Sequence, residues 1–188
     1  MKGVFRVLTI VTLTAAAWSQ QTAEPKTPAA TPPQTKDPVA TSIRTLFPRQ
    51  QKNILAAIEA MPADKFSYKP TPDQITFGHL VVHITESNNS LCAKVADVPA
   101  PKAAEVKDTD PKDKLLAAAK ASFDFCGEAT SKMDDSKLGD SVELFGGHQF
   151  PRAMAALGLA SGWADHYGAA AMYLRLNGIL PPTAQPKK

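Results

Sequence analysis

Four histidines are the residues of this 188-residue chain whose type and spacing could do chemistry: His79, His83, His148 and His166. His79 and His83 stand four positions apart, a spacing that puts both on one side of a helix and allows two imidazoles to bind one metal ion. His166 could bring a third imidazole from another helix. His148 lies beside Gly146 and Gly147, and we expect it to be exposed or structural.

The same histidines also permit a purely structural interpretation. His83 lies about 100° from the centre of the apolar stripe of its helix, at the edge of that stripe, where it can face a groove. In this interpretation His83 and His166 are hydrogen-bonded groove histidines, and His79 is solvated. The residues alone leave the metal site and the structural interpretation open.

Other familiar sites are excluded by residue type and spacing. Ser161 and Asp165 flank His166, but neighbouring residues on a helix do not face each other, so they form no nucleophile triad with it. No Gly-rich phosphate loop follows a strand, and the Glu-x-x-His motifs of a di-iron bundle are missing. The formal net charge is only +3, which argues against a nucleic-acid partner.

Four segments with apolar residues at helical spacing are expected to position the histidines, at about 39–61, 76–95, 111–133 and 150–176. Pro48 interrupts the first segment and should kink or break it. The connection 138–149 is either a short strand pair or a loop. Four helices of about 20 residues imply an all-α fold, a four-helix bundle.

The N-terminus is typical of a secretory signal peptide over residues 1–19. Lys2 and Arg6 provide a basic start, the apolar run Val7–Ala17 follows, and small residues precede the expected cleavage after Ser19. That run is too short to span about 30 Å of hydrocarbon as an anchor. We therefore expect an exported protein, periplasmic or extracellular, with no membrane span after cleavage. Removing the two basic residues leaves 19 basic against 18 acidic residues.

Three further regions follow the signal peptide. Residues 20–38 are rich in proline, with no apolar pattern to bury, and predict a disordered linker. Residues 39–180 hold the helical pattern and predict one bundle domain. Residues 181–188 predict a flexible tail.

Three phrases carry a resemblance to a known family: the helix end Met61-Pro62, the segment Phe77–Ile84, and the ending His166–Pro182. At these residues the chain resembles the DinB-like family of four-helix bundles. The resemblance covers about Val39 to Thr183. It implies that the helices run in up-down-down-up order. It also implies homodimers formed through helix faces.

The resemblance further implies a divalent metal, zinc or nickel, held by three histidines. By position, His83 matches the ligand from the second helix and His166 matches the last ligand of the fourth helix. The remaining ligand position falls on Gly162, which has no side chain to bind metal. His79 is the other residue that could supply the third imidazole, next to His83.

The only two cysteines, Cys92 and Cys126, predict a disulfide, because an exported protein matures where disulfides persist. They lie about equally far into the second and third helices. They can therefore meet only if those helices run parallel, which the long connection 96–110 allows and the resemblance implies. The alternative is two buried free thiols.

Two functions follow from these observations. The first is a non-catalytic or degenerate-site module that binds an unidentified small molecule or protein in the groove where the family holds its metal. Trp163 next to Gly162 could line that groove, although it is more typical of a packing residue. The second is a metal-dependent enzyme, because relatives in the DinB-like family include thiol transferases, hydrolases and isomerases. Low-molecular-weight thiols are cytoplasmic, which favours the binding module for an exported chain.

Overall fold

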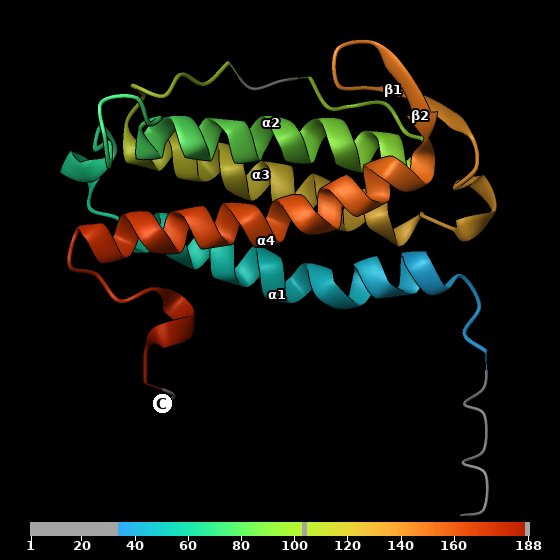
Figure 1. Ribbon diagram of the computed structural model, residues 1–188, viewed down its shortest axis with the longest axis horizontal. Helices are drawn as coiled ribbons and strands as arrows, with labels where there is room; N and C mark the ends of the chain where they lie inside the picture. The colour runs from blue at the N-terminus through green and yellow to red at the C-terminus, as the bar shows by residue number, and fades with distance from the viewer. Residues whose placement is uncertain (1–33, 103–104, 187–188) are drawn as a thin grey trace, which may run out of the picture. The chain divides into compact units, whose positions relative to one another are not determined.

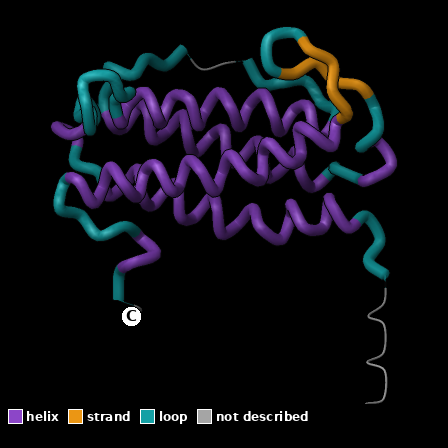
Figure 2. Tube along the Cα trace, viewed as in Figure 1, coloured by secondary structure: helices purple, strands orange, loops and turns teal. Residues whose placement is uncertain are grey.

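The computed structural model describes residues 34–102 and 105–186, all but the first of which belong to the unit Thr35–Lys188. Four helices make up most of it: α1 (Pro38–Ala60), α2 (Phe77–Ala96), α3 (Lys112–Ser131) and α4 (Arg152–Leu176) (Figure 1). Loops, two short 3₁₀ turns and one hairpin connect them, and a third 3₁₀ turn follows α4 (Figure 2). The predicted all-α four-helix bundle is confirmed. The predicted signal peptide and residues 20–33 of the predicted linker lie outside the described residues, and the last linker residue, Pro38, begins α1.

Contacts between helix ends establish the order up-down-down-up. At the end of α1, the carbonyls of Glu59 and Met61 accept hydrogen bonds of 2.7 and 2.8 Å from the ammonium of Lys112, at the start of α3. Near the end of α4, the Tyr173 hydroxyl donates to the carbonyl of Ile75, just before α2 (2.6 Å). Helices α1 and α4 therefore run antiparallel to α2 and α3.

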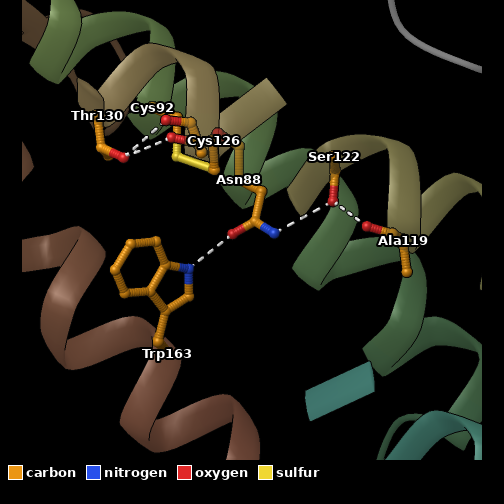
Figure 3. Close-up of a disulfide and its surroundings, with 8 residues drawn as sticks. Asn88, Cys92, Ala119, Ser122, Cys126, Thr130 and Trp163 are labelled. Carbon is orange, nitrogen blue, oxygen red and sulfur yellow. Dashed lines mark hydrogen bonds between the residues drawn. A yellow bond between two sulfur atoms is a disulfide. The ribbon is translucent and has the colours of Figure 1, made fainter. Parts of the chain in front are cut away.

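Helices α2 and α3 lie parallel and share two consecutive levels of contact (Figure 3). Cys92 and Cys126 pair at disulfide distance, with Cα atoms 5.2 Å apart. One turn earlier on both helices, the Asn88 amide donates to the Ser122 hydroxyl at 3.1 Å. Both contacts advance by four residues in the same direction on the two helices, which requires that the helices run parallel. The connection after α2 accordingly returns along the bundle to the start of α3 (Figure 1).

A buried amide links this pair of helices to α4. The Asn88 side-chain oxygen accepts a hydrogen bond of 2.9 Å from the indole of Trp163 (Figure 3). Trp163 is 1% exposed and packs against Phe47 of α1, with ring centroids 5.3 Å apart. Trp163 is therefore a core residue of α4 that contacts α1 and α2, and it does not line an open groove.

Local sequence explains where the helices begin and how α1 tolerates proline. The Thr76 hydroxyl caps α2 by accepting from the backbone N–H of His79 (2.9 Å). The carboxylate of Asp135, beyond α3, caps α1 by accepting from the N–H groups of Val39 and Ala40. The predicted break at Pro48 is wrong, because α1 continues through it. Pro48 is exposed, so the carbonyl one turn earlier, which loses its partner, lies on the solvent side.

The connection before α4 forms a strand pair, the first of the two predicted alternatives. Strands β1 (Ser141–Leu144) and β2 (His148–Pro151) are antiparallel, with Val142 opposite Phe150. The turn between them has positive φ at three successive residues, Phe145, Gly146 and Gly147. Glycine accepts this backbone without strain, whereas Phe145 adopts it at a cost. The hairpin presents Phe145 at its tip, 63% exposed.

The end of the described chain contacts the bundle. Pro182–Ala184 form a single 3₁₀ turn, and the Tyr167 hydroxyl of α4 lies 2.7 Å from that of Thr183. The backbone N–H of Thr183 also donates to the Tyr167 hydroxyl at 3.0 Å. The first residues of the predicted tail are thus hydrogen-bonded to α4. In the part of the chain that the structure describes, no helix combines the length and apolarity that a bilayer span needs.

Candidate histidine site

His83 of α2 and His166 of α4 meet across the bundle. Their rings are edge to face, with centroids 5.1 Å apart and planes at 86°. His83 is exposed, and its Nε2 lies 3.5 Å from the hydroxyl of Ser87, one turn further along α2. His166 is 7% exposed. The pair therefore combines one accessible imidazole and one buried imidazole.

Burial keeps His166 uncharged. Loss of solvation, and secondarily the proximity of His83, lower the pKa of His166 to about 4, and the carboxylate of Asp165 opposes this shift only partly. Its Nδ1 is buried and has no hydrogen-bond partner within residues 34–102 and 105–186. At neutral pH, His166 is thus a neutral imidazole with one buried ring nitrogen that has no hydrogen-bond partner in the described part of the chain.

The backbone of Gly162 lies beside this pair, one turn before His166 on α4. A Cβ built on Gly162 would meet Cε1 of His166 at 3.7 Å, an ordinary van der Waals contact. The position therefore faces the histidine pair and has room for a side chain. The close packing of another helix does not explain the glycine at this position.

The other two histidines lie apart from the pair. The Nδ1 of His79 is 3.9 Å from a carboxylate oxygen of Asp108, and both side chains are about half exposed. His148 is exposed on β2, beside the ring of Phe150. The predicted set of three imidazoles from His79, His83 and His166 is not formed, because His79 sits at the start of α2 against the connection that precedes α3.

The residues present do not fit the three-histidine metal centre that the resemblance implied. His83 and His166 supply two imidazoles, and the third position holds Gly162. Among the described residues, no group of three His, Cys, Asp or Glu side chains is placed to hold an ion. A catalytic zinc site normally has three protein ligands and one open position. We therefore derive no catalytic step through a metal here.

A groove adjoins the histidine pair, between α2 and the hairpin. It has a volume of about 720 Å³. Its α2 wall includes His83, Ser87 and Lys94, and its hairpin wall includes Glu143 and the turn Phe145–Gly147. Sequence reasoning missed the hairpin as a wall, although Gly146-Gly147 was a visible turn signal. His83 belongs both to the pair and to this groove, which we call the histidine groove, whereas His166 and Gly162 are not among the residues that line it.

We expect acid to destabilise the protein through His166. Since its pKa is about 6.5 when unfolded and about 4 when folded, the unfolded chain takes up the proton first as the pH falls. The free energy of unfolding should drop by about 2–3 kcal/mol between pH 6.5 and pH 4 from this group, and level off below. Urea unfolding of the parent and of His166→Gln across this range measures it. An identical pH dependence in both proteins would contradict the assignment.

Comparison with known proteins identifies the fold family. A solved DinB-like protein from Bacillus cereus ATCC 10987 superposes with a TM-score of 0.61 at 16% identity, covering 76% of this chain and 95% of that chain. The DinB-like protein YjoA from Bacillus subtilis gives a TM-score of 0.61 at 19% identity, covering 77% and 99%. No curated protein matches the chain. The family model described as the DinB superfamily matches residues 46–169, from within α1 to within α4, and on this match the chain belongs to that superfamily.

Proposed function

We propose that this protein is an exported binding module that takes a small molecule in the histidine groove. The observation that carries the proposal is the pairing of His83 and His166 beside a groove of about 720 Å³, with a glycine at the position of the third ligand. A volume of this size suits a small organic ligand. The accessible ring of His83 offers a hydrogen bond at the mouth, and the neutral His166 lies behind it.

The groove has the mixed lining of a ligand site. Leu91 and Phe145 provide apolar surface, while Glu86, Lys94 and Glu143 provide charges of both signs. Phe145 also lies near α4, because a Cβ on Gly158 would meet its ring at 3.9 Å.

The test is equilibrium dialysis of the purified protein against a small-molecule extract of the culture medium or periplasm, read by mass spectrometry. We expect the parent to enrich a compound that His83→Phe does not enrich, because the larger apolar ring removes the hydrogen bond and fills the mouth. The matched control is His148→Phe, the same change on the exposed hairpin strand, which should bind like the parent. Equal enrichment by parent and His83→Phe would refute the proposal.

The alternative function is a metal-dependent enzyme of the DinB-like thiol transferase or hydrolase class. The neutral His166 with a free Nδ1 is the observation in its favour. Metal analysis of the same protein, purified without chelator, separates the two functions. One metal ion per chain would favour the enzyme and overturn the binding module.

We also propose that export removes residues 1–19. The support is the basic start at Lys2 and Arg6 followed by the short apolar run Val7–Ala17. The intact mass of the periplasmic or secreted product should correspond to a chain that begins near Gln20. A full-length mass in a soluble cytoplasmic fraction would contradict this prediction.

A further inference from the structure

A second cleft lies beside the histidine groove, over the C-terminal half of α2. It has a volume of about 650 Å³. Its walls are α2, the segment Val98–Pro101 that follows α2, and the start of the hairpin at Val142 and Glu143. Neither His83 nor His166 lines it.

Two residues that line this cleft each carry a buried polar side-chain atom without a hydrogen-bond partner. These atoms are the side-chain oxygen of Asn89 and the Nε of Arg152, and neither has a hydrogen-bond partner in the described part of the chain. A buried polar group left unpaired costs about 1–3 kcal/mol, so such groups are rare in folded proteins. An acceptor and a donor that lack partners in the same cleft point to a ligand that satisfies both.

The guanidinium of Arg152 is held in place by the protein. Arg152 is 5% exposed. One terminal nitrogen donates to the carbonyl of Lys94, and the other donates to a carboxylate oxygen of Asp97 at 3.1 Å. Asp140 lies 4.0 Å from the same nitrogen. These bonds fix the plane of the guanidinium, so its Nε–H is a preorganised donor. A ligand that binds it therefore loses little free energy to ordering the side chain.

The charges around the cleft favour an uncharged ligand. The positive charge of Arg152 is already matched by Asp97, and the remaining charged lining residues are Lys94, Glu86 and Glu143. An anion would thus meet a net negative lining. The rest of the surface is largely apolar, with Ala93, Val98, Pro99, Ala100, Pro101 and Val142.

We infer that this cleft binds a small uncharged molecule with an apolar body and a carboxamide group. The carbonyl of the carboxamide accepts from Nε–H of Arg152, and its N–H donates to the side-chain oxygen of Asn89. An ester lacks the donor, and a carboxylate lacks the donor and adds a negative charge. The inference goes beyond the function proposed for the histidine groove and does not depend on it.

Nuclear magnetic resonance titration tests directly whether a carboxamide binds at Arg152 and Asn89. Arginine Nε–H and asparagine side-chain amide signals are observed in the ¹⁵N-labelled protein. The probes are cyclohexanecarboxamide, its analogue methyl cyclohexanecarboxylate and the cyclohexanecarboxylate anion. We expect the carboxamide to shift the signals of Arg152 and Asn89 saturably, and to bind about fivefold or more tightly than the other two, since it makes one more hydrogen bond.

Two variants in the walls of the cleft and one control variant outside it test where the carboxamide binds. Asn89→Leu keeps the size of the side chain and removes the acceptor, so it should abolish the preference for the carboxamide over the ester. Ala100→Trp, at an exposed position, should block the cleft by bulk without touching the core. His83→Gln changes the neighbouring histidine groove and should leave carboxamide binding unchanged.

Four results would each overturn the inference. The first is the absence of a saturable shift at Arg152 in the parent. The second is equal affinity for carboxamide and ester. The third is carboxamide binding that persists unchanged in Ala100→Trp, which would place the probe elsewhere. A loss of carboxamide binding in His83→Gln would also overturn it, because the probe would then occupy the histidine groove.

Discussion

Reduction of the Cys92–Cys126 disulfide is expected to lower the free energy of unfolding by about 3–4 kcal/mol. The two cysteines are 34 positions apart in the sequence, so the bridge closes a long loop in the unfolded chain and removes much of its entropy. Both residues are fully buried between the parallel helices α2 and α3. A reduced pair would leave two thiols packed in the same place, so the change acts mainly on the unfolded state.

Urea unfolding with and without a reductant measures this effect. The control is the double variant Cys92→Ala with Cys126→Ala, whose stability should not respond to the reductant. Thiol labelling of the denatured, unreduced mature protein tests the bridge itself. Two reactive thiols per chain would show that the cysteines are free, and the predicted stabilisation would then be absent.

Gly162→His is expected to raise the affinity for zinc at least about tenfold, equivalent to about 1.4 kcal/mol or more. A histidine there stands one turn before His166 and about 40° round the helix from it, so it shares the face of the pair. The 3.7 Å contact with Cε1 of His166 leaves room for the new Cβ. With His83, the site would then have the three protein ligands of a zinc centre. Replacing a glycine inside α4 should also stabilise the helix by up to about 1 kcal/mol.

Calorimetric titration with zinc and with nickel compares the parent and the variant. Gly168→His is the matched control, because Gly168 is an exposed glycine of the same helix with free space around it. It adds one histidine without adding a ligand to the pair, and should change the affinity little. An equal gain in both variants would mean that a surface histidine, and not the completed site, binds the metal.

The helices could be predicted from the sequence because their apolar residues recur at helical spacing and their ends carry local signals. Cys92 and Cys126 indicated that α2 and α3 run parallel. Each cysteine lies about equally far from the start of its helix, so the two can pair only if the helices run in the same direction. Of the two outcomes predicted at Pro48, a kink or a break, the break is wrong. A proline is costly in a helix when its lost hydrogen bond is buried, and burial depends on tertiary packing that the sequence does not display.

The candidate site was predictable only in part. The resemblance to the DinB-like family implied His83 and His166 as ligands, and the structure brings their rings together. His79 lies against Asp108 instead, a contact that depends on how the connection after α2 packs. Arg152 carried no signal at all. At the start of α4, Arg152 donates hydrogen bonds to Lys94 and Asp97 at the end of α2. These two residues stand more than fifty positions earlier in the sequence.

The central claim is that this DinB-superfamily chain has only two of the three metal ligands and does not hold a divalent metal tightly. Calorimetric titration of the unmodified protein with zinc tests it most directly. We predict weak binding or none, with little change in His79→Ala. Tight binding of one zinc ion per chain, abolished by His79→Ala, would contradict the account and show that His79, His83 and His166 form the site together.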